Sequence, residues 1–353
     1  MFEDFFNPTN TAYSLKEIYD INDYSENVFY GVNLIWPTFD LDENFDRYFL
    51  SWHTEQIDVF WLIKQAKRVY PKKVLVVSDE YVDSSGIWPR NIEFLTWHTI
   101  GKQLDKAIDY FGINQNPSKP TFKFSSLSFR HSQYKKFVTS YMLSNISNDD
   151  MILSWHGYLG KSEDLHDHPV GFAWLDDLDF DILAQKYQIN FLDDYNNSKN
   201  SPIQNSDWNM PAYTNALVNL TNESFHYSNT LINGIPVCYP FPYITEKTYK
   251  PLLAGRPFVA IGQCNTLKKL RTLGFRTDFG WDDDYDLDCG DLTRIGKIFD
   301  TISSINSCTI DKLYDDSFPA VKHNIDHIIS GNLTEVCQSL NNTQRQTIQD
   351  FVN

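Results

Sequence analysis

Cysteine is scarce in this sequence, and long apolar runs are missing. The five cysteines among 353 residues are scattered, and no two of them have CxxC spacing. An odd and dispersed set is evidence against a disulfide framework and against structural zinc, so we expect a reduced intracellular setting. No run approaches the roughly 18 apolar residues that a membrane span requires. The N-terminal stretch MFEDFFNPTN lacks the basic and apolar regions of a secretory signal. The sequence therefore predicts a cytoplasmic protein without a membrane span.

Basic residues are few relative to acidic ones. The chain has 30 lysines and arginines against 46 aspartates and glutamates, which gives a net charge of −16. This balance opposes a broad electrostatic attraction to nucleic acid or to an anionic membrane, although it leaves room for a local basic groove. The dense basic patch of the N-terminal half, which is either such a strip or an exposed helix end, consists of Lys64, Lys67, Arg68, Lys72 and Lys73.

Several common functional motifs are also missing. The sequence has no Walker A, GxGxxG or GxSxG motif, which removes the main support for NTPase, dinucleotide-binding and hydrolase functions. The segment 165–168 has two histidines but no evident third zinc ligand. The acidic segment 282–288 lacks the glycine and the terminal glutamate of a calcium loop. We expect both segments to be solvated, and we expect no metal site.

The sequence does contain enough apolar residues for a substantial core, and they are arranged in alternating strand and helix patterns. Apolar residues make up 42% of the chain and aromatic residues 15%. Periodicity predicts strands at 28–36, 74–77, 122–129, 151–155 and 258–261, and helices at 56–70, 92–111, 133–143, 181–187, 248–254, 267–273 and 292–302. Residues 212–221 fit a helix or a strand, and residues 225–239 are loop-like with a strand at most at their start. Such alternation is typical of an α/β protein with parallel sheets and crossover helices.

The polar, proline-containing segment 113–119 is the predicted domain boundary. We therefore expect an N-terminal domain at 1–115 and a C-terminal domain at 120–353. The acidic region 157–210, rich in asparagine and aspartate, is expected to be an insertion into the second domain.

The stretch 243–262, YITEKTYKPLLAGRPFVAIG, combines a charged loop, a short helix and a buried strand. Tyr243 precedes Thr245, Glu246 and Lys247, which lie where the loop meets the helix N-terminus. Backbone N–H groups and the helix dipole favour an anion at such a position, and Lys247 adds a full positive charge. The stretch is therefore either a phosphate site or an ordinary helix start with an acid in its first turn.

Arg130 lies in a similar position, after a predicted strand and before a predicted helix. Arginine suits bidentate phosphate binding, although a surface arginine at a helix start is an equal alternative. A transferase also needs a carboxylate or a histidine as general base. The candidates in the N-terminal half are His53, Glu55, Asp58, Asp79 and Glu80. Among these we select Glu55 and Asp79, while helix-surface and capping roles remain open for each.

The stretch 243–262 resembles the donor-binding motif of the α-1,3-fucosyltransferase family, and more closely the fucosyltransferase-like glycosyltransferases of phages and bacteria. The similarity continues through residues 267–277 and 281–282. Upstream, residues 128–131 resemble the strand–arginine–helix element of such enzymes, and residues 223–225 resemble an acid-containing loop before the motif. The resemblance is specific over 243–281 and loose over the C-terminal two-thirds.

The resemblance implies a GT-B-like fold, in which two Rossmann-like domains face each other across a cleft. The C-terminal domain would bind a GDP- or UDP-sugar, with Lys247 and Arg130 on the diphosphate and Glu246 on the ribose or ordering the site. Thr245 belongs to the same motif, and Tyr243 and Glu223 are further donor-binding candidates. Transfer would be inverting and independent of metal and cofactor, with a carboxylate base in the N-terminal domain.

The acceptor stays open at this stage. A glycan, a lipid-linked sugar, a protein and a hydroxymethylated pyrimidine in viral DNA all offer the required hydroxyl group. Two other functions also remain open: a non-catalytic nucleotide- or sugar-binding module on the same fold, and a metal-dependent phosphohydrolase built on Asp79, Glu80 and the histidines.

Overall fold

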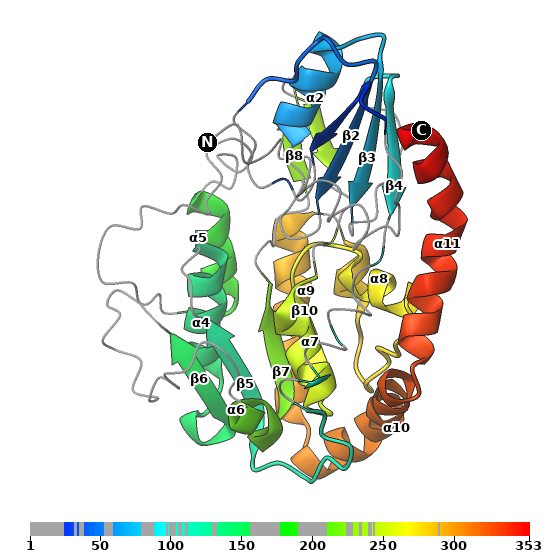
Figure 1. Ribbon diagram of the computed structural model, residues 1–353. Coiled ribbons are helices and arrows are strands. Elements are labelled where there is room, and N and C mark those ends of the chain that lie inside the picture. The colour runs from blue at the N-terminus through cyan, green and yellow to red at the C-terminus, as the bar shows by residue number, and fades with distance from the viewer. Residues whose placement is uncertain are drawn as a thin grey trace. The chain divides into compact units, whose positions relative to one another are not determined.

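The computed structural model describes most of the chain in two compact units (Figure 1). The first unit comprises residues 1–105 and 332–353, and the second comprises residues 106–331. The residues described are 25–31, 34, 39–52, 59–78, 88–96, 98, 104, 108–109, 112–128, 133–155, 177–189, 210–223, 229–232, 235–238, 242, 244–288 and 290–353. No helix in this part of the chain is long and apolar enough to cross a membrane.

The first unit is built on a four-stranded sheet with the order β1-β2-β3-β4, and every strand pair is parallel. Its elements are β1 (Val28–Gly31), β2 (Arg47–Trp52), α2 (Val59–Arg68), β3 (Lys73–Ser78), β4 (Ile92–Thr96) and the C-terminal helix α11 (Asn332–Val352). Alternate residues of β3 lie in two different apolar clusters. Val74 and Val76 pack with Leu62 of α2, whereas Leu75 and Val77 pack with Ile348 of α11. Because side chains alternate along a strand, α2 and α11 cover opposite faces of this sheet.

The second unit is built on a four-stranded parallel sheet with the order β10-β7-β5-β6. Its strands are β5 (Phe122–Ser128), β6 (Met151–Trp155), β7 (Ala216–Asn222) and β10 (Phe258–Ile261), with a separate antiparallel hairpin of β8 (Asn229–Ile232) and β9 (Ile235–Cys238). Its helices are α4 (Gln133–Asn145), α5 (Asp177–Lys186), α6 (Met210–Asn215), α7 (Glu246–Leu253), α8 (Thr266–Thr272), α9 (Asp291–Ser307) and α10 (Ile310–Ile329), with 3₁₀ turns at Asn148–Asp150 and Asp284–Leu287.

The strand order of this second sheet contains a switch point. The chain passes from β5 outward to β6, then returns to the other side of β5 to form β7 and continues outward to β10. The order therefore reverses between β5 and β7. In open α/β sheets, ligands bind outside the carboxyl ends of the strands at such a reversal. The carboxyl end of β7 is Asn222, whose side-chain amide donates to Ser128 Oγ at the end of β5 over 3.2 Å.

Most of the predicted elements are confirmed, including the helix and strand of the 243–262 stretch and the strands β3, β5 and β6. The helix predicted at 92–111 is wrong at its start, because residues Ile92–Thr96 form strand β4. These residues pair along β3, and that pairing outweighs the helical spacing of their apolar side chains. The strand predicted at 28–36 ends earlier, at Gly31, and the loop-like 225–239 contains the hairpin β8–β9.

Strand β2 was not among the predicted strands. It lies between β1 and β3 and pairs with both, so the hydrogen bonds of its backbone come from neighbouring strands that are distant in the sequence. The sequence-based division assigned residues 120–353 to the second domain. In the structure, residues 332–353 cluster with the first unit.

Candidate functional site

Four of the eight predicted site residues lie outside the described part of the chain. They are Glu55, Asp79, Arg130 and Tyr243. Glu246 is the first residue of α7, and Glu223, Thr245 and Lys247 are described with their side chains. The structure brings these last three together at the carboxyl end of β7.

Helix α7 begins at Glu246 because the residue before it, Thr245, is a good N-cap. Its backbone is extended, with φ −112° and ψ −177°, and its hydroxyl accepts a hydrogen bond from the Lys247 N–H over 3.3 Å. The helix ends at Leu253, with Ala254 as the C-cap, and the next residue, Gly255, has a φ of +64°, the left-handed conformation that glycine adopts without strain. A side chain there would also meet the Asn114 carbonyl oxygen, which lies 3.0 Å from the position of a Cβ atom.

Glu223 follows the last residue of β7 and is completely buried. Its Oε2 accepts the Thr245 hydroxyl and its Oε1 the Thr248 hydroxyl, each over 2.5 Å. The Thr245 N–H lies 3.2 and 3.3 Å from the two oxygens. All of these groups are donors, which is the arrangement that an ionised carboxylate requires when it is buried.

The backbone of Glu223 is fixed as firmly as its side chain. Its N–H donates to the Ile261 carbonyl of β10 over 2.9 Å, and its carbonyl accepts the Tyr134 hydroxyl of α4. Gly262 lies close by, since a Cβ atom on it would sit 3.2 Å from Glu223 Cβ. Glu223 therefore ties the end of the sheet to the first turn of α7.

Lys247 is the positive charge of this cluster. Its backbone N–H and its Nζ both donate to the Thr245 hydroxyl oxygen, over 3.3 and 3.2 Å, and that hydroxyl in turn donates to Glu223. The side chain is half-buried. A helix N-terminus and an ammonium group thus lie together at the carboxyl ends of β7 and β10, next to the switch point. Chemically, this arrangement suits an anion such as a phosphate.

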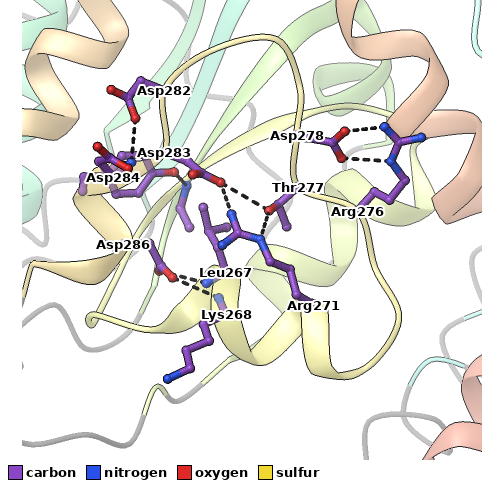
Figure 2. A network of polar contacts seen from close by, with 12 residues as sticks. Leu267, Lys268, Arg271, Arg276, Thr277, Asp278, Asp282, Asp283, Asp284 and Asp286 are labelled. Carbon is purple, nitrogen blue, oxygen red and sulfur yellow. Dashed lines mark hydrogen bonds and ion pairs between the residues drawn. The ribbon is translucent and has the colours of Figure 1, made fainter.

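The neighbouring helix α8 also begins at a buried carboxylate, but this carboxylate accepts two backbone N–H groups of the helix directly (Figure 2). Asp286 accepts the N–H groups of Leu267 and Lys268 over 2.8 and 2.9 Å, so the protein's own acid occupies this helix N-terminus. Burial raises the pKa of Asp286 to about 6, against the lowering effect of the two N–H groups. At the start of α7 the N–H groups of Thr245 and Lys247 are likewise held by protein groups, the Glu223 carboxylate and the Thr245 hydroxyl, so an external anion there would rely on the Lys247 ammonium group.

Three acids precede Asp286 in the same loop. Asp282, Asp283 and Asp284 are the one group in the described residues with acidic ligand atoms all within 4.8 Å of one another. Asp283 forms an ion pair with Arg271 and accepts a hydrogen bond from Thr277 over 3.4 Å, as Figure 2 shows. The Asp284 N–H donates to Asp282 Oδ1 over 2.9 Å. These contacts explain two of the acids as parts of a folded loop.

The basic patch of the N-terminal half is partly neutralised. Arg68 pairs with both Asp40 and Glu43, and Lys64 lies 3.6 Å from Asp40. Lys72 donates to the Phe45 carbonyl oxygen over 2.7 Å. Because acids from the loop before β2 compensate these cations, the patch is weaker as an electrostatic surface for DNA than the sequence suggested.

Sequence reasoning missed Thr248, which is completely buried and holds one oxygen of Glu223. Its position three residues after the N-cap Thr245 is the signal that could have identified it, since such residues face the same side of a helix start. Comparisons with protein-family models, with curated proteins and with solved structures gave no match to this chain.

Proposed function

We propose that the protein is a glycosyltransferase that transfers a sugar from a nucleotide-sugar donor to an acceptor hydroxyl. The donor's diphosphate binds at the N-terminus of α7, where Lys247 neutralises one of its charges. The observation that carries this proposal is the fixed helix start at the switch point of the parallel sheet, with a lysine in its first turn.

The chemistry of such a transfer needs stabilisation of the departing nucleoside diphosphate. The Lys247 ammonium group and the dipole of α7 supply this where the leaving-group charge develops, and they need no metal ion to do so. Arg130 follows β5 in the sequence and is proposed as the second cation, with Glu246 on the ribose and Tyr243 beside it. A carboxylate of the first unit, Glu55 or Asp79, is proposed as the base that removes the acceptor proton, with inversion at the anomeric carbon.

Two further features support the proposal. Each unit contains a four-stranded parallel sheet with helices, as a GT-B-like pair of Rossmann-like domains requires. The resemblance of residues 243–281 to fucosyltransferase-like enzymes concerns the same segment that forms α7, β10 and α8. The acceptor is a glycan or a hydroxymethylated pyrimidine, and the partial neutralisation of the basic patch favours the glycan.

The test is a thermal-shift panel of GDP, UDP and other nucleoside diphosphates with their sugars. A ligand at 100 times its dissociation constant stabilises the folded state by about 2.7 kcal/mol, which is a readily measured shift. The Lys247→Ala variant should weaken binding of the stabilising nucleotide by ~10- to 100-fold, because a hydrogen bond to a charged group contributes about 1.5–3 kcal/mol.

Lys268→Ala is the matched control. Lys268 is exposed in the first turn of α8, where Asp286 already occupies the N–H groups, so its loss should leave the affinity unchanged. If no nucleotide raises the melting temperature, the donor site is refuted. Binding of a nucleotide sugar without turnover on any acceptor would instead identify a non-catalytic binding module, and loss of activity in EDTA would contradict the metal-independent mechanism.

A further inference from the structure

We propose that Glu223 is a positioning residue that acts on Lys247 through the hydroxyl of Thr245, and that it does not contact the ligand. As a statement about donor binding, this inference rests on the proposed function, whereas the positioning of Lys247 itself is testable without any ligand. The three side chains form a chain of hydrogen bonds from Lys247 Nζ to Thr245 Oγ and from there to Glu223 Oε2.

Burial excludes direct contact between Glu223 and a ligand in this conformation. None of its surface is exposed, and the two hydroxyls that hold its oxygens come from residues that are themselves buried, Thr248 completely and Thr245 to all but 9% of its surface. An anionic ligand would in any case be repelled by a carboxylate at close range. The carboxylate therefore influences the site through what it holds in place.

The orientation of the Thr245 hydroxyl is the means of this influence. A hydroxyl has one proton and two lone pairs. Because Glu223 accepts the proton over 2.5 Å, the lone pairs are left to accept the backbone N–H and the Nζ of Lys247. The carboxylate thereby fixes the direction of the hydroxyl, and the hydroxyl fixes both the first turn of α7 and the lysine head group. Lys247 is held before a ligand arrives, which reduces the ordering cost of binding.

Removing the charge should disturb this chain without removing volume. In the wild type each oxygen of Glu223 accepts one threonine hydroxyl. In Glu223→Gln one of these oxygens becomes an NH₂ group, which cannot accept a proton, so at least one of the two hydroxyls must turn and accept a hydrogen bond instead of donating one. Thr245→Val removes the intermediate hydroxyl at nearly constant size, and Thr245→Ser restores it. Asp286→Asn is the matched control, because it neutralises a buried carboxylate at the neighbouring helix start and leaves this chain of bonds intact.

The experiment measures binding of GDP and UDP by calorimetry in these variants and in a double-mutant cycle with Lys247→Ala. We expect Glu223→Gln and Thr245→Val each to weaken binding of the preferred nucleotide by ~10-fold, Thr245→Ser to bind normally, and Asp286→Asn to bind as the wild type does. Because Glu223 acts through Lys247, adding Glu223→Gln to Lys247→Ala should cause no further loss. A full additional loss in the double variant, or an equal loss in Asp286→Asn, would overturn the inference.

A second measurement separates this inference from the proposed function. Acetylation of the ligand-free protein by acetic anhydride, quantified by peptide mass spectrometry, gives the rate at Lys247 relative to exposed Lys268. Loss of the hydroxyl bond should raise this ratio by at least about two-fold in Glu223→Gln and Thr245→Val, and not in Asp286→Asn. An unchanged ratio refutes positioning whether or not nucleotides bind. A raised ratio in a protein that binds neither GDP nor UDP supports positioning and refutes the donor site.

Discussion

Asp286 allows a quantitative prediction of how stability depends on pH. Its carboxylate is buried at the start of α8, and burial raises its pKa from 3.8 to about 6. Between these two pH values the folded state holds a proton that the unfolded state has already released. The contribution of Asp286 to stability must therefore fall as the pH rises through this range, and this contribution becomes constant again above it. The pKa difference of about two corresponds to a loss of about 3 kcal/mol.

The perturbation is Asp286→Asn, which keeps the size of the side chain and removes its titration. The new NH₂ group faces one of the two backbone N–H donors, which costs stability by an amount that does not depend on pH. Between pH 4 and pH 7 the stability of the variant relative to the wild type should rise by about 2–3 kcal/mol, because the wild type acquires a buried charge over this range. Other titrating groups are common to both proteins, so their effects cancel in the difference.

The assay is urea unfolding of both proteins at several pH values between 4 and 7. Hydrogen exchange of peptides from β10 and α8 reports the second unit separately from the first, which two-unit proteins require. The prediction concerns the difference between the two unfolding free energies. A difference that stays constant over this range, or a wild type that gains stability relative to the variant as the pH rises, would refute the reasoning.

Three further predictions concern packing and capping. Gly274→Ala should destabilise the second unit by ~1–3 kcal/mol, because Gly274 has a φ of +90° and a Cβ atom would lie 2.7 Å from the His327 ring. Thermal unfolding measures this loss, and an unchanged stability would contradict the geometry. Ile348→Ala should destabilise the first unit by ~2–5 kcal/mol, since this α11 side chain is completely buried against the sheet. The protection of β3 amides from hydrogen exchange should fall as well, and unchanged protection would contradict the packing of α11 on that sheet. Thr309→Ala should cost ~1 kcal/mol through loss of the α10 N-cap, in which the Thr309 hydroxyl accepts a hydrogen bond from the Lys312 N–H over 3.3 Å. Thr309→Ser keeps this hydroxyl and should be neutral in the same assay.

Sequence patterns determined those elements in which the capping residues, the apolar spacing and the terminating residues all indicate the same structure. The stretch 243–262 has a charged loop, a short amphipathic run, a terminating glycine and a four-residue apolar strand, and the structure contains a helix that begins two residues earlier than predicted, the glycine after it and the strand. Such local signals depend on backbone geometry and on burial of one short segment, so they need no knowledge of distant residues. For the same reason the sequence located the helix start that carries Lys247.

Tertiary structure decided what depended on partners far along the chain. Residues Ile92–Thr96 became a strand because β3 lies beside them, and Asn332–Val352 joined the first unit because that sheet has an apolar face to cover. The role of Glu223 was decided in the same way. Only the pairing of β7 with β10 and the packing of α7 place its carboxylate within 2.5 Å of two threonine hydroxyls that follow it by more than twenty residues. Hydrogen bonds of this kind act over a few ångströms in space and leave no periodic trace in the sequence.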